Sequence, residues 1–247
     1  MPAAFARFMF CFTALGCALA SCGGGGSSVA PDATPQDPDA TPTPDAFVSC
    51  NVLFLNFEGA TLQQAGVDNP AADQSVLLAN AMATIAAYQV GNPNRAAAIA
   101  AITTQVRTIL QPLGVAVVTE RPASGVYAMT LLGGVSTDIG AASNLVALAP
   151  ARGDCQPEPA VITFVFDSNL ANAQVGNAVI GTYGITRGIP ITTLATDCMC
   201  FSAGSCTMPT SECSIGGAGT ARDPTAQCGT GGSFDEHAAF VTALHCP

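Results

Sequence analysis

The sequence contains no lysine and only two histidines, and charged residues make up 10% of its 247 residues. A phosphate-binding loop of the Gly-x-x-x-x-Gly-Lys type is excluded because its lysine does not exist here. Seven arginines stand against 17 acidic residues, which gives a formal net charge of −10. An acidic chain without a basic cluster is a poor ligand for the nucleic-acid backbone or for anionic lipid headgroups. We therefore expect no nucleic-acid partner.

Long apolar runs are also absent, apart from Phe8–Ala20 near the N-terminus. A helix that spans a bilayer needs about 20 apolar residues, so this shorter run is typical of a signal-peptide core. The run leads into Leu19, Ala20, Ser21 and Cys22, which resemble a bacterial lipobox. The resemblance implies cleavage before Cys22 and attachment of palmitate-type acyl chains there, as the only membrane anchor. An ordinary cleaved signal with an unrelated cysteine is the alternative.

This interpretation predicts a lipoprotein of the bacterial cell envelope, anchored at the outer membrane. Its exported domain would lie in the periplasm or on the cell surface. The segment 22–46 is rich in glycine, proline and aspartate and has almost nothing to bury, so we expect a disordered tether. The expected organisation is therefore a signal peptide over 1–21, the tether over 22–46, an α/β domain over 47–197 and a cysteine-rich lobe over 198–247.

Cysteine is abundant, with 11 residues in the chain. Two would leave with the signal peptide and Cys22 would be acylated. An even number remains, which in an exported chain predicts disulfides, although the pairing stays open. A zinc cluster is the alternative, but Cys198-Met199-Cys200 lacks the spacing of a CxxC knuckle. The disulfide candidates are Cys50, Cys155, Cys198, Cys200, Cys206, Cys213, Cys228 and Cys246.

The apolar patterning predicts an α/β (α+β) fold with a twisted, mostly parallel sheet of about five strands and two or three helices. Glycine and proline separate the strands, and regular patterning ends near Cys198. The expected strands lie at 51–57, 115–119, 127–132, 145–148 and 161–166. The expected helices lie at 73–89, 95–110 and 169–185, with a short one at 234–244.

Three local features resemble the zinc metallopeptidases called metzincins. The first strand, Phe54-Leu-Asn-Phe-Glu-Gly59, is similar to the opening of that group. The helix over 169–185 ends Gly181-Thr-Tyr-Gly-Ile-Thr-Arg-Gly-Ile189, where the family has His-Glu-x-Gly-His-x-x-Gly-Leu. Beyond it, Asp197-Cys-Met199 resembles the methionine turn under the metal. The resemblance covers about residues 50–200 and implies a zincin-like fold with a backing helix, an active-site helix after the strands and an irregular final lobe.

The chain departs from the metzincin motif at the positions that ligate zinc and at the position of the general base. Gly184 and Gly188 match family glycines, and Met199 matches the methionine of the turn. The histidine positions hold Gly181 and Ile185, the general-base position holds Thr182 next to Tyr183, and the third ligand position holds Ile191. Glycine and isoleucine cannot ligate zinc, and no carboxylate remains to relay a proton. The resemblance thus implies a pseudoenzyme with no cofactor, and coincidence in an unrelated α/β fold is the alternative.

Three functions follow from these residues. The first is a non-catalytic envelope lipoprotein that binds a peptide or protein, in a cleft at Gly181, Thr182, Ile185 and Ile191 or by β-addition at an edge strand. The second is an active zinc peptidase with relocated ligands, His237 and His245 with an acid. Eight residues on one helix correspond to a rise of about 12 Å, so these two histidines cannot share one ion without a break in the helix. The third is a coat or spacer protein without a specific ligand.

Overall fold

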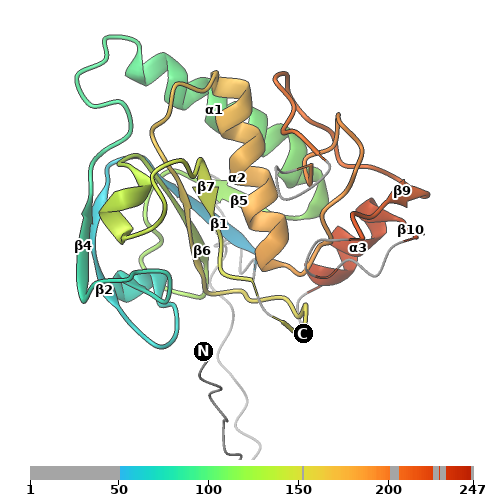
Figure 1. Ribbon diagram of the computed structural model, residues 1–247, viewed down its shortest axis with the longest axis horizontal. Helices are drawn as coiled ribbons and strands as arrows, with labels where there is room; N and C mark the ends of the chain where they lie inside the picture. The colour runs from blue at the N-terminus through green and yellow to red at the C-terminus, as the bar shows by residue number, and fades with distance from the viewer. Residues whose placement is uncertain (1–50, 152, 201–205, 225–227, 229–231, 246–247) are drawn as a thin grey trace, which may run out of the picture. The chain divides into compact units, whose positions relative to one another are not determined.

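The computed structural model describes residues 51–151, 153–200, 206–224, 228 and 232–245. Its centre is a five-stranded sheet in the order β5-β1-β6-β8-β7 (Figure 1). Four strands are parallel, and β7 joins β8 antiparallel at one edge. The expected α/β class and the mostly parallel sheet are confirmed. The bounds are β1 Val52–Asn56, β5 Ala116–Val118, β6 Ala128–Leu132, β7 Ala147–Leu148 and β8 Ile162–Val165.

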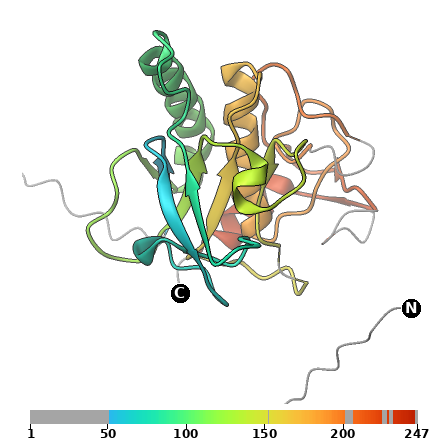
Figure 2. The ribbon, with the colours of Figure 1, turned by 60° about the vertical axis from the view of Figure 1, so that its left-hand side comes forward.

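Alternating side chains of these strands pack into two apolar cores, one on each face of the sheet. On β1, Leu53 and Leu55 join one core while Phe54 joins the other, because successive strand residues point to opposite faces. The first core lies under α1 (Arg95–Leu110) and α2 (Asn172–Thr186). Figure 2 shows the two helices together on one side of the sheet. Apolar residues at intervals of three and four on α1 placed this helix correctly from the sequence.

A second, three-stranded sheet in the order β3-β2-β4 covers the other core. It consists of β2 (Ala60–Gln64), β3 (Gln74–Ser75) and β4 (Met82–Ile85), with 3₁₀ turns at Pro70–Ala72 and Ser136–Ile139 nearby. The expected helix over 73–89 is therefore wrong. β4 alternates exposed Met82 and Thr84 with buried Ala83 and Ile85, which is the period of a strand, and it pairs antiparallel with β2.

The region after α2 has little regular structure, as expected. Among the described residues, Cys198–Cys213 and Cys200–Cys206 are disulfides within this region, and Cys155–Cys228 joins it to the loop before α2. Two short strands, β9 (Thr220–Ala221) and β10 (Ser233–Phe234), pair antiparallel. The 3₁₀ turn Gln111–Leu113 follows α1, and the last helix is α3 (Glu236–Ala243). The predicted helices near 169–185 and 234–244 correspond to α2 and α3, with small shifts at their ends.

Several expectations lie outside the described residues. These are the signal peptide, the lipobox with Cys22, the tether over 22–46, and the candidates Cys50 and Cys246. Within the described part of the chain, none of the helices combines the length and apolar character that a bilayer crossing requires.

Candidate functional site

Helix α2 is buried along most of its length, and Gly188, two residues beyond its end, lets another segment approach. Gly188 has a φ of 72°, a left-handed conformation that favours glycine. A Cβ at Gly188 would collide with the carbonyl oxygen of Cys155. The disulfide Cys155–Cys228 joins this approaching loop to the C-terminal region. The end of α2 is thus enclosed between two segments that are distant in sequence.

The residues that the sequence resemblance aligns with the histidine and glutamate positions of the metzincin motif lie inside the protein. Gly181 is buried, and Ile185 packs against the core shared by α1 and α2. Thr182 is 2% exposed, and its hydroxyl donates to backbone oxygens one turn earlier in α2, at 2.8 Å from Ala178. Ile191 is also buried, and its carbonyl accepts the Asp223 N–H. None of these four expected cleft residues lines either of the two described pockets.

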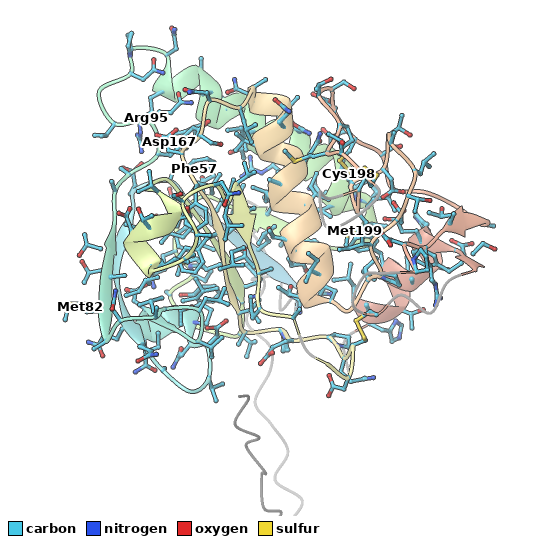
Figure 3. The ribbon with its side chains drawn as sticks, in the orientation of Figure 1. Phe57, Met82, Arg95, Asp167, Cys198 and Met199 are labelled. Atoms are coloured by element: carbon cyan, nitrogen blue, oxygen red, sulfur yellow. A yellow bond between two sulfur atoms is a disulfide. The ribbon has the colours of Figure 1, made fainter. Side chains whose placement is uncertain are left out.

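Gly184 and Met199 lie in close contact. A Cβ at Gly184 would collide with the Met199 sulfur and crowd the Phe240 ring of α3. Met199 has no exposed surface, and Figure 3 shows it with Cys198 beside α2. The Met199 N–H donates to the Asp197 carboxylate at 2.7 Å, which fixes the turn. The turn therefore packs its Met199 side chain against the C-terminal half of α2.

Within the described residues, no group of three His, Cys, Asp or Glu side chains is placed to hold a metal ion. His237 lies on α3 and His245 lies beyond its end, and both are exposed. The relocated-ligand hypothesis therefore gains no support from their positions.

Two carboxyl groups meet beneath the turn, a relationship that the sequence did not indicate. Asp197 and Glu236 each have 0% exposure. The Glu236 carboxylate accepts the Gly216 N–H at 2.6 Å. Burial, together with the neighbouring Asp197, raises the pKa of Glu236 to about 10. Glu236 is thus protonated at neutral pH and can donate a hydrogen bond to Asp197.

A cluster of polar side chains lies near the N-terminal ends of α1 and α2 and has a structural role. Arg95 donates to the carbonyls of Tyr88 and Phe57 and pairs with Glu58 at 2.8 Å. The Asp167 carboxylate accepts the Gln89 N–H at 2.9 Å. Figure 3 shows Phe57, Arg95 and Asp167 close together beyond the sheet. These charged side chains form hydrogen bonds with backbone groups of the loops, so we infer that their role is to hold the loops in place.

A cleft with a volume of about 570 Å³ lies between the end of α2 and one face of α3. Asp235, Ala238, Ala239, Thr242 and Ala243 recur at intervals of three and four along α3, so they share a face. Most of these side chains are small, which leaves the space open. The cleft is also lined by Cys155, Gln156, Pro157, Arg187, Gly188, Ile189, Arg222 and Phe234.

Arg187 is the most unusual group in the cleft lining. It is 3% exposed, and its guanidinium lies 4.6 Å from the Tyr183 ring centroid. Its Nη1 donates to the Glu158 carbonyl at 2.8 Å, whereas Nε and Nη2 have no acceptor among the described residues. Burial raises the pKa of the Tyr183 hydroxyl, an effect that the Arg187 charge partly opposes. A buried cation with unused donors is costly unless an anion or water completes it.

Sequence reasoning singled out Gly188 only as a motif glycine, and it did not identify Arg187, Arg222 or the α3 face as parts of a cleft. The scarcity of cations was a usable signal, since two of only seven basic side chains line one cleft. Comparisons with protein-family models, curated proteins and solved structures find no match for this chain. The functional argument therefore rests on its own residues and geometry.

Proposed function

We propose that this chain is a lipid-anchored protein of the bacterial envelope whose exported domain is a non-catalytic, metzincin-like binding module. Its ligand is a segment of a peptide or protein. The observation that carries the binding role is the cleft of about 570 Å³ beside the buried Arg187. A concave site with an apolar lining and few converging polar groups is the usual form of a ligand site.

The order of the elements supports the metzincin-like assignment. Helix α1 backs the sheet, α2 follows the last sheet strand, and an irregular disulfide-containing region follows α2. The contact of Gly184 with Met199 adds a specific link between the helix and the turn. These are the features that the sequence motif implies for this family, in the same order along the chain.

The chemistry of the motif positions supports loss of catalysis. Gly181 and Ile185 offer no donor to a metal, and the Thr182 hydroxyl is engaged within its own helix. A zinc peptidase needs the metal as a Lewis acid and a carboxylate to move protons, and these positions supply neither ligand nor base. The scaffold is retained while its reactive groups are replaced.

The disulfides support an exported location. Three are formed among the described residues, and such bonds persist in oxidising compartments. Together with the lipobox resemblance at Leu19–Cys22, they favour an envelope lipoprotein. Labelling of expressing cells with radioactive palmitate tests the anchor. Incorporation should disappear in Cys22→Ser and persist in Ser21→Ala, a neighbouring change that keeps the acyl acceptor.

The catalytic question is tested by metal analysis and proteolysis on the same sample. The full chain is exported in a bacterial host, purified in detergent, dialysed against trace zinc and assayed with casein. We expect far less than one zinc per chain and no chelator-sensitive cleavage. Stoichiometric zinc that is lost in His237→Ala, but not in the exposed control Asn80→Ala, would overturn this proposal in favour of relocated ligands.

A further inference from the structure

The cleft beside α2 concentrates positive charge in an acidic chain. Elsewhere among the described residues, Arg95 and Arg121 pair with carboxylates. Arg187 and Arg222 both line this cleft. One acidic residue lines it as well: Asp235, whose carboxylate already accepts the Ala238 N–H at 2.9 Å as the cap of α3. The lining therefore carries a net positive charge, although the whole chain carries −10.

Arg187, a residue of the cleft lining, has donor groups without an acceptor among the described residues. A guanidinium presents a rigid fork of N–H groups that matches the two oxygens of a carboxylate. One arm of the Arg187 fork is committed to the Glu158 carbonyl. The other side of the fork, Nε and Nη2, has no acceptor among the described residues, although only 3% of the residue is exposed. Packing against Tyr183 holds the fork in place, so its orientation is fixed before a ligand arrives.

The rest of the lining suits a peptide rather than a free ion. Ile189, Phe234 and Pro157 add apolar surface, and small side chains along α3 let a backbone approach closely. Arg222 lies over the Phe234 ring at 4.8 Å, on the same cleft. Such a site provides one strong oxyanion contact and an apolar wall beside it. A doubly charged phosphate would be attracted by the two arginines but repelled by the Asp235 carboxylate, which makes it a poorer ligand.

We propose that this cleft binds the carboxylate group of a peptide segment and that Arg187 is the residue that holds it. The inference rests on the proposed binding function and names the ligand chemistry within it. The carboxylate belongs either to the end of a peptide chain or to an acidic side chain. Both sources present the same pair of oxygens to the Arg187 fork.

The test follows arginine side-chain signals by NMR in the full, exported chain, labelled with ¹⁵N-arginine. Because the chain has only seven basic residues, all arginine, each Nε–Hε signal can be followed separately. The probes are acetyl-trialanine with a free carboxylate, the same peptide as its amide, acetyl-Ala-Glu-Ala-amide and inorganic phosphate. Arg187→Lys removes one signal and thereby assigns it.

We expect the Arg187 signal to move with a carboxylate-bearing peptide and the amide to bind at least about tenfold more weakly, because a charge-assisted hydrogen bond is lost. Response to free-carboxylate trialanine identifies a chain terminus as the source, whereas response to the glutamyl peptide identifies a side chain. Arg187→Lys should weaken binding although it keeps the charge. Arg107→Gln, which alters an arginine bonded to the Val117 carbonyl outside the cleft, should not.

Failures of the inference and of the proposed function give different results. If the amide and the acid peptides move the same signals equally, carboxylate recognition is wrong while peptide binding stands. If phosphate moves the Arg187 signal and no peptide does, the assignment of a peptide ligand is wrong. If no peptide perturbs any arginine or backbone signal, the binding function fails as well. Arg222→Gln provides a second cleft variant if Arg187→Lys does not fold, and it should weaken the carboxylate response of the Arg187 signal.

Discussion

Glu236 at the start of α3 and Asp197 before the methionine turn place their carboxyl groups together, with 0% exposure of either residue. One shared proton reconciles this arrangement with burial, since two adjacent charges in the interior would repel strongly. The pair joins the turn beneath α2 to the helix that forms one wall of the cleft.

This pair predicts that stability falls as the pH rises. Burial and Asp197 raise the pKa of Glu236 from an ordinary value of 4.5 to about 10. Between those values the folded state holds a proton that the unfolded state releases, so the free energy of unfolding decreases with pH. A single group contributes up to about 1.4 kcal/mol per pH unit. This contribution is complete below pH 4.5 and lost by about pH 10.

Urea unfolding at several pH values between 5 and 9 measures this slope. Glu236→Gln should flatten it and stabilise the protein at pH 8, because an amide supplies the donor permanently. The exposed control Glu212→Gln should keep the slope of the parent chain. An identical slope in Glu236→Gln and the parent would show that the pair does not hold a proton.

The sequence specified the main sheet and helix α1 well because their signals are local. Val52–Asn56 consists mostly of a continuous apolar run, as expected for a buried strand, and the apolar residues of Arg95–Leu110 recur at intervals of three and four. The prediction of a helix over 73–89 was wrong because the alanines of this segment favour a helix. Strand β4 within it is short and half exposed, so its strand pattern is weak. Pairing of Thr61 with Thr84, whose hydroxyls lie 3.0 Å apart, and of their neighbours overrides that propensity.

The cleft could not be derived in the same way, because its groups meet only in three dimensions. Arg187 and Arg222 are separated by a cysteine-rich stretch whose pairing the sequence leaves open. The expected cleft was assigned to Gly181 and Thr182 by motif position, yet both are buried. Both residues lie within α2, whereas the cleft lies beyond the end of that helix.

Asn177 is a buried polar hub, and its removal should be costly. Its Oδ1 accepts from Gln105 at 2.7 Å and from the Cys213 N–H at 3.0 Å, and its Nδ2 donates to the Pro209 and Ser211 carbonyls. Asn177→Ala would leave these partners unsatisfied. We expect a loss of about 2–4 kcal/mol in chemical unfolding. The exposed control Asn80→Ala should change stability little, and equal effects of the two would contradict this role.

Gly188 and Gly184 should differ in their tolerance of alanine. At Gly188 the obstacle is the Cys155 backbone and φ is 72°, so neither side can yield. At Gly184 the obstacle is mainly the end of the Met199 side chain, which can shift. We expect losses of about 2–3 kcal/mol for Gly188→Ala and about 1–2 kcal/mol for Gly184→Ala in thermal or urea unfolding.

Gly153→Ala is the matched control for these substitutions, since a Cβ there meets nothing within 4 Å. Met199→Leu should change the cost of Gly184→Ala and leave that of Gly188→Ala unaltered, because only the former pair is in contact. The reverse order of the two losses would contradict the packing described around the end of α2.

The disulfide Cys155–Cys228 should contribute more stability than Cys200–Cys206, because it closes 73 residues rather than 6. Loop-closure entropy gives about 4 kcal/mol for the long loop and about 2 kcal/mol for the short one. Paired Cys→Ser substitutions at each bridge, compared by urea unfolding, measure the difference. The long bridge also anchors the loop whose Glu158 carbonyl binds Arg187, so its removal should shift the Arg187 side-chain NMR signal, whereas removal of the short bridge should not. Equal losses from the two bridges, with an unmoved Arg187 signal in both, would show that the cleft is held by packing alone.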